Sequence, residues 1–207
     1  FTSDKNNKLK VLLITGPQGS GKTRLAINLA EETIHEYNKT NPNGDGLNNW
    51  ILFGDCDELN QSGSGVPFEP FSQALHDILG AGRFEPPAKK ANKIKEGINS
   101  TGLGNILDVA GLGVLSMILG TQDEEVKSAT TAEMVQIIIQ TLVGLSKTRP
   151  VIFIIDDLHW IDPITNTLFE NILTKLAQES TRNILFIFTS RIEKESEASS
   201  NADPIKY

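Results

Sequence analysis

The sequence predicts an α/β fold with three layers, in which helices cover both faces of a mainly parallel sheet. Two observations lead to this prediction. Short apolar segments alternate with helical patterns, and a glycine-rich turn joins the first apolar segment to the first helix. Strands that alternate with helices pair in parallel, because each helix carries the chain back across the sheet. We also expect a helical insertion at about residues 80–130, before the third strand.

Four segments have the apolar, partly β-branched composition of buried strands. They are residues 9–15, 50–56, 151–155 and 183–189. Helical spacing of apolar residues predicts helices at 23–37, 70–79, 130–146 and 163–179. The last helix opens with Asp162 and Pro163, an N-cap residue followed by proline at the first helical position. We expect residues 1–192 to form the domain and the polar residues 193–207 to form a mobile tail.

Composition narrows the class of protein. The chain has 207 residues, 26 acidic and 19 basic side chains, and a formal net charge of −7. This balance argues against a broad nucleic-acid-binding surface, which needs clustered Lys and Arg. The single cysteine, Cys56, excludes an internal disulfide framework and a multi-cysteine zinc site, and no signal peptide is visible. We expect a cytoplasmic protein and, since the chain starts at Phe1, a piece of a longer one.

The glycine-rich turn matches the phosphate-binding pattern G-x-x-x-x-G-K-[ST] in full. Its residues are Gly16, Pro17, Gln18, Gly19, Ser20, Gly21, Lys22 and Thr23. Glycines let successive backbone N–H groups wrap an anion, and the following helix adds the positive end of its dipole. Lys22 would reach the β- and γ-phosphates, and the Thr23 hydroxyl would bind Mg²⁺. We expect this loop and Arg24 to bind nucleotide; the alternative is a chance glycine-rich turn.

A second element is the apolar segment VIFIIDDLHW at residues 151–160, which ends its strand in two aspartates. In open parallel sheets ligands bind at the carboxyl ends of the strands. Asp156 is expected to hold Mg²⁺, and Asp157 to orient or deprotonate the attacking water. The alternative is an acidic turn that caps the next segment. His159 and Trp160 would either position the base or pack the loop.

The third element is the sequence FIFTSR, which ends at Arg191. If this strand neighbours the first one, Thr189, Ser190 and Arg191 lie beside the phosphate loop. A polar group there can bind the attacking water or sense the γ-phosphate. The alternative is a polar strand end whose arginine makes a surface ion pair.

Other features favour structural roles. The apolar run 103–119 approaches the length of a membrane span, but its place between the two motifs favours a buried or partner-binding insertion. Lysines in the segment 89–95 indicate a solvated helix face rather than a nucleic-acid or partner patch. These lysines are Lys89, Lys90, Lys93 and Lys95. We expect Cys56 to be a buried thiol and His76 to lie on a helix surface.

Together, the phosphate loop, the double aspartate followed by LHWID at residues 158–162, and the terminal TSR at 189–191 resemble the STAND NTPases. These are signal-transduction P-loop ATPases related to the AAA+ and origin-recognition ATPases. The segment 65–75, GVPFEPFSQAL, is also similar to that group. The resemblance covers most of residues 9–191 outside 80–130.

The resemblance implies ATP and Mg²⁺ binding, slow hydrolysis, and a switch between a closed ADP state and an open, often oligomeric ATP state. By position, Lys22 and Thr23 contact the phosphates and Mg²⁺, and Asp156 assists the metal. Asp157 becomes the catalytic acid and Arg191 the sensor. The implied partners are nucleotide, other domains of the polypeptide and other protomers, but not a membrane or nucleic acid.

Three interpretations of function follow. The first is an ATP-hydrolysing switch in a signalling or regulatory protein. The second is a nucleotide-gated scaffold with negligible turnover. The third is an origin-recognition-like DNA-loading ATPase, which would need a winged helix and a basic DNA-binding face. The family's Gly-Arg-Glu adenine box, fifth strand and helical lid are not matched in these 207 residues, so we expect an excerpt of a larger protein.

Overall fold

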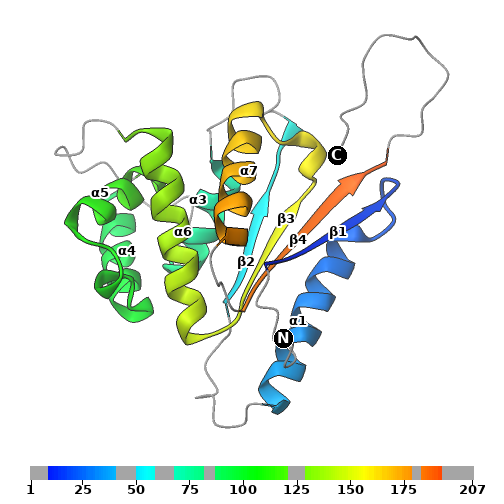
Figure 1. Cartoon of the computed structure of the whole chain (residues 1–207), viewed down its shortest axis with the longest axis horizontal. Helices are drawn as coiled ribbons and strands as arrows, with labels where there is room; N and C mark the ends of the chain where they lie inside the picture. The colour runs from blue at the N-terminus through cyan, green and yellow to red at the C-terminus, as the bar shows by residue number, and fades with distance from the viewer. Residues whose placement is uncertain are drawn as a thin grey trace.

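Within the described residues, the sheet has four parallel strands in the order β1-β4-β3-β2 (Figure 1). The computed structural model describes residues 9–40, 50–58, 68–81, 87–120, 129–178 and 183–192. The strands are β1 (Lys10–Gly16), β2 (Trp50–Asp55), β3 (Val151–Asp156) and β4 (Ile184–Arg191). Every strand pairing is parallel. The fourth strand along the chain therefore lies between the first and the third.

Helices flank the sheet on both faces. Helix α1 (Lys22–Thr40) packs on one face, against β1, β3 and β4. The other face is covered by α3 (Glu69–Ile78), α6 (Thr131–Thr148) and α7 (Pro163–Gln178) (Figure 1). The predicted three-layer α/β fold is confirmed.

A group of helices precedes β3, as the predicted insertion requires. It contains α4 (Pro87–Thr101), the 3₁₀ turn η1 (Leu103–Asn105) and α5 (Val109–Ile118). Both η1 and α5 contact α6, and Figure 1 shows the group on the side of α6 away from the sheet. On α4, Lys89, Lys93 and Lys95 are exposed, as expected for a solvated face, and Lys90 is half-buried. The domain limits at 1–192 stay a prediction, and the tail 193–207 lies outside the described residues.

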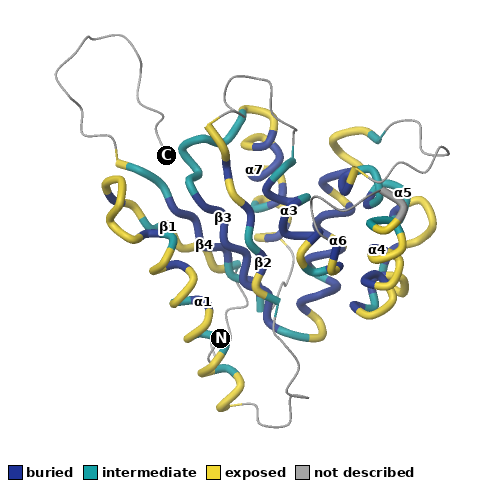
Figure 2. Tube along the Cα trace, turned by 180° about the vertical axis from the view of Figure 1, so that it is seen from behind, coloured by how far each residue is buried: buried dark blue, intermediate teal, exposed yellow. Residues whose placement is uncertain are grey.

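The core centres on β3, whose six residues are all buried (Figure 2). A strand that is covered on both faces can be apolar at every position, which explains the run VIFII. Phe153 of β3 stacks on Phe186 of β4 with ring centroids 5.6 Å apart, and Phe71 of α3 meets Phe153 edge to face at 5.4 Å. These aromatic contacts join the sheet to the helices on this face.

The helix ends follow the capping residues in the sequence. Asp162 caps α7 as predicted, because its Oδ1 accepts from the backbone N–H groups of Ile164 and Thr165, at 3.0 and 2.9 Å. Helix α6 begins with a reciprocal capping box between Thr130 and Glu133. The other strand and helix limits differ from the predicted ones by at most three residues.

The prediction that the first strand is buried is wrong. Strand β1 is an edge strand of the described sheet, and Val11 and Leu13 are 50% and 54% exposed. An edge strand has a neighbour on one side only, so its side chains keep contact with solvent. Helix α1 buries Ala26 and Ala30 while Leu25 is exposed. Small side chains on that face let the helix lie close to the sheet.

The prediction that His76 lies on a helix surface is also wrong, since it is only 4% exposed. Its helix, α3, is enclosed from two directions. Gly54 of β2 lets the backbone of Pro70 approach, and Gly97 of α4 lets the backbone of Leu79 approach. Close backbone contacts thus occur near both ends of α3, and six of its ten residues are buried.

We predict that Gly54→Ala lowers the free energy of unfolding by about 2 kcal/mol, because the added Cβ would overlap the carbonyl group of Pro70 and lie 2.8 Å from its Cα. Chemical denaturation measures the change. Gly104→Ala is the matched control: its Cβ would meet Ile98 at 3.5 Å, an ordinary contact, and we expect a change below about 0.5 kcal/mol. Equal stability of the two variants would contradict the close packing of α3 on β2.

Candidate nucleotide-binding site

The phosphate loop joins the end of β1 to the start of α1. Gly19 and Gly21 have positive φ angles of 73° and 83°, which L-residues other than glycine rarely adopt. At Gly16 an added Cβ would lie 3.0 Å from the Ser20 hydroxyl, a tight contact that the serine side chain would have to relieve. The sequence pattern and the local backbone therefore agree on a loop that can wrap a phosphate.

Lys22 is the first residue of α1 and is 9% exposed. Its Nζ donates a hydrogen bond of 3.1 Å to the backbone carbonyl of Pro17, which holds the ammonium against the loop. The loop residues 17–21 are exposed, as is Arg24 one turn into the helix. An anion bound by this loop would therefore meet backbone N–H groups and one ammonium group together.

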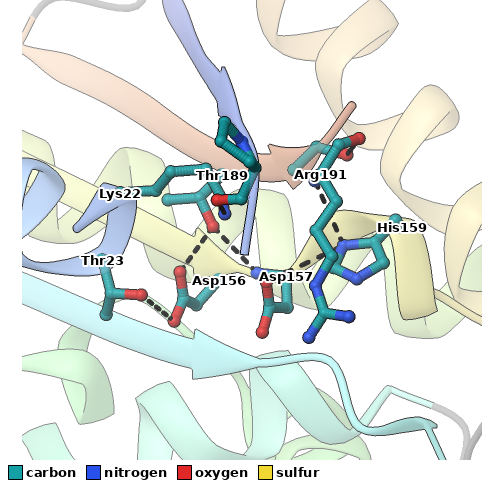
Figure 3. A network of polar contacts seen from close by, with 9 residues as sticks. Lys22, Thr23, Asp156, Asp157, His159, Thr189 and Arg191 are labelled. Carbon is teal, nitrogen blue, oxygen red and sulfur yellow. Dashed lines mark hydrogen bonds and ion pairs between the residues drawn. The ribbon is translucent and has the colours of Figure 1, made fainter. Parts of the chain in front are cut away.

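Asp156 connects the loop to the sheet. Its Oδ2 accepts from the Thr23 hydroxyl at 2.7 Å, and its Oδ1 accepts from the Thr189 hydroxyl at 2.5 Å (Figure 3). Asp156 is 7% exposed; its bond with Thr189 is buried and its bond with Thr23 is partly buried. One carboxylate thus joins the start of α1, the end of β3 and the end of β4.

Asp157 lies just beyond β3 in a different backbone conformation. Its φ and ψ of 50° and 46° are left-handed, and they turn the chain out of the sheet. Its backbone N–H donates to the Thr189 hydroxyl at 2.9 Å. The Asp157 carboxylate remains 32% exposed, unlike that of Asp156. The two neighbouring aspartates therefore differ: one is bound within the protein and the other can contact water.

A third carboxylate, Asp55, was missed by the sequence analysis. It ends β2 in register with Asp156, and one oxygen from each of Asp55, Asp156 and Asp157 lies within 4.8 Å of the others. The signal was available, because carboxyl ends of parallel strands meet at one edge of a sheet and Asp55 follows an apolar strand. Carboxylate and hydroxyl oxygens so close together are the ligands that Mg²⁺ prefers, so this site fits that cation.

The predicted sensor, Arg191, lies beside the loop as expected, because β4 pairs with β1 and Arg191 is in register with Gly16. Its side chain points elsewhere. The guanidinium lies 5.8 Å from the ring centre of Trp160, and Figure 3 shows it directed away from Lys22. Its backbone N–H donates to His159 Nδ1 at 3.4 Å. The structure therefore brings Arg191 to the site but not its guanidinium to the loop.

Cys56 lies next to these carboxylates and is buried, as predicted. Burial, and then the negative charges of Asp55, Asp162, Asp156 and Asp157, raise the pKa of its thiol to about 12. Both causes disfavour the thiolate, so this cysteine stays neutral near pH 7 and is not a nucleophile.

These features coincide with a known family. A model of the AAA ATPase domain matches residues 2–187. The chain belongs to the AAA ATPase domain family. It is therefore a P-loop NTPase and a nucleotide-binding ATPase module. The chain matches none of the curated proteins compared with it. Among solved structures it is similar to a nucleotide-free ATP-binding cassette from an ABC transporter, with 13% identity, coverage of 89% of this chain and 70% of that chain, and a TM-score of 0.34.

The apolar run 103–119 of this AAA ATPase domain is divided between η1 and the ten-residue helix α5. In the parts of the chain that the structure describes, no helix combines the length and apolar character needed to cross a membrane. Leu103 and Leu115 are fully buried instead, in agreement with the expected buried insertion.

We predict that Thr189→Val lowers the free energy of unfolding of the domain by about 2 kcal/mol, measured by chemical denaturation. Valine keeps the shape but leaves the buried Asp156 carboxylate without one donor and the Asp157 N–H without its acceptor. Thr167→Val serves as the control, since Thr167 is exposed and its hydroxyl bonds only to its own helix at Pro163. A loss at Thr189 no larger than at Thr167 would contradict the bridging role.

Proposed function

We propose that this AAA ATPase domain is a Mg²⁺-dependent switch of the STAND type, which binds ATP and hydrolyses it slowly within a cytoplasmic signalling or regulatory protein. The observation that carries the proposal is the hydrogen bond between Thr23 and Asp156. It joins Thr23, which follows Lys22 of the phosphate loop, to Asp156, the last residue of β3. A hydroxyl and a carboxylate in contact next to a phosphate loop form the pair that holds Mg²⁺ in P-loop NTPases.

In this proposal the loop binds the phosphates of ATP or ADP. The backbone N–H groups of residues 16–23 donate to phosphate oxygens, and the positive end of α1 adds to their attraction. Lys22 exchanges its bond to Pro17 for the β- and γ-phosphates, where its charge stabilises the transition state. Arg24, exposed on the first turn of α1, adds a positive charge near the nucleotide.

Thr23 and Asp156 would hold Mg²⁺, with Asp55 close enough to contribute through water. A bound Mg²⁺ supplies charge neutralisation at the β- and γ-phosphates. Asp157 accepts a hydrogen bond from the attacking water and orients it, which its partial exposure allows. Arg191 acts as the sensor once its guanidinium leaves Trp160.

The switch would transmit the identity of the bound nucleotide to other domains of the polypeptide and to other protomers. The resemblance of the loop, the double aspartate and the TSR segment to STAND NTPases supports this part of the proposal. The contact of Arg191 with Trp160 supports it as well. A sensor that responds to nucleotide needs another contact for its side chain when it does not bind the nucleotide, and Trp160 provides one. Nucleic acid is not an expected partner, given the net charge of −7.

Lys22→Ala is expected to weaken ATP binding by at least about a hundredfold, because it removes a charged hydrogen-bond donor from the phosphate site. Isothermal titration calorimetry with Mg·ATP measures the loss. The control is Lys39→Ala on the same helix, which removes an exposed ion pair with Glu36 and leaves affinity unchanged. Tight ATP binding by the Lys22 variant would overturn the assignment of the loop.

Asp157→Asn is expected to retain ATP affinity and to lower phosphate release by about a hundredfold, because the neutral amide oxygen is a weaker acceptor for the attacking water and cannot take its proton. Single-turnover phosphate release measures the rate. Asp77→Asn on the exposed side of α3 is the control and should not change it. Equal turnover of wild type and Asp157→Asn would overturn the catalytic assignment. A wild type that retains ATP for hours without releasing phosphate would favour the nucleotide-gated scaffold.

A further inference from the structure

The pairing of β3 and β4 continues past the last paired residues through side chains. The last backbone pair is Ile155 with Phe188, and Asp157 then turns the chain out of the sheet. Beyond that point the backbone of β4 would lack hydrogen-bond partners on the side that faces β3. Two side-chain contacts take their place, as the Thr189 hydroxyl accepts from the Asp157 N–H and His159 Nδ1 accepts from the Arg191 N–H.

One atom of His159, Nδ1, lies close to two functional groups. Its Nδ1 lies 3.4 Å from the Arg191 nitrogen and 3.7 Å from Asp157 Oδ1 (Figure 3). An Nδ1 that accepts from the Arg191 amide carries a lone pair, and the same atom forms an ion pair with Asp157 when the ring is protonated. One ring edge of His159 therefore lies against both the end of β4 and the Asp157 carboxylate, and it limits the space open to that carboxylate.

The position of the imidazole is itself determined by its neighbours. The rings of His159 and Trp160 lie 4.8 Å apart, and the side chain of His159 is 16% exposed. Trp160 also lies below the guanidinium of Arg191. The short 3₁₀ turn η2 (Leu158–Trp160) thus contacts both the backbone and the side chain of Arg191. Movement of the end of β4 is consequently linked to the orientation of the Asp157 carboxylate.

We propose that His159 is a positioning residue for hydrolysis, which holds the Asp157 carboxylate and the end of β4 in a fixed relation. This inference rests on the proposed function, because Asp157 is the group that orients water there. In Figure 3, His159 lies on the opposite side of Asp157 from Lys22 and Thr23. Its loss should therefore slow the chemical step and leave nucleotide affinity unchanged.

Two substitutions separate this role from simple packing. In His159→Asn the amide oxygen occupies the place of Nδ1 and can still accept from the Arg191 N–H, because it is equally far along the side chain. In His159→Gln the side chain is one bond longer, so its oxygen lies beyond that place. We expect Gln to lower kcat for phosphate release about tenfold with KM and the Kd for ATP within about twofold. Asn should remain within about threefold of the wild type.

His35→Gln, on the exposed surface of α1, is the control for loss of a histidine and should leave all three quantities unchanged. Equal kcat values for the Asn and Gln variants would overturn the proposal. So would a loss of ATP affinity as large as the loss of kcat, since that pattern indicates damage to the fold of the site.

Amide hydrogen exchange at Arg191 supplies a readout that does not depend on turnover. We expect its protection to persist in His159→Asn and to fall about tenfold in His159→Gln. Equal exchange in both variants would overturn the contact itself. A wild type without phosphate release would overturn the proposed function and the positioning role together, whereas the exchange data would still report whether His159 holds the end of β4.

Discussion

The Asp156 carboxylate accepts hydrogen bonds from Thr23 of α1 and Thr189 of β4, and the rest of the site depends on these two bonds. They join residues that are 133 and 33 positions apart in the chain. A buried carboxylate needs such donors, because an unpaired charge in the interior is costly. The same need keeps the phosphate loop, the acidic strand end and β4 at one edge of the sheet.

The strand order makes this arrangement possible. Because β4 lies between β1 and β3, its end faces the phosphate loop on one side and the aspartates on the other. Thr189 and Arg191 therefore contact β3 and the residues that follow it, while Arg191 stays in register with Gly16. Hydrogen bonds thus run from Thr23 through Asp156 and Thr189 to the backbone of Asp157.

Most elements of the fold could be predicted from sequence because their signals are local. The loop pattern, the capping residue Asp162 and the run VIFIIDD each depend on neighbouring residues. The wrong predictions concern which side chains are buried. His76 is buried in a helix whose two ends pack closely against Gly54 and Gly97, and Val11 is exposed in a strand at the edge of the described sheet. Asp55 could have been predicted, since it ends an apolar strand, although Asp156 and Asp157 are about a hundred residues away in the chain.

The sequence by itself determined which chemical groups this protein carries: a phosphate-binding loop with its lysine, a hydroxyl and a pair of carboxylates. Glycine conformation and helix dipoles act over a few residues, so the pattern alone predicts them. Only the tertiary structure decided how these groups divide their roles. Buried hydrogen bonds hold Asp156, a left-handed backbone exposes Asp157, and Trp160 seats Arg191 away from the loop. Those differences arise from contacts between distant segments, which spacing along the chain does not encode.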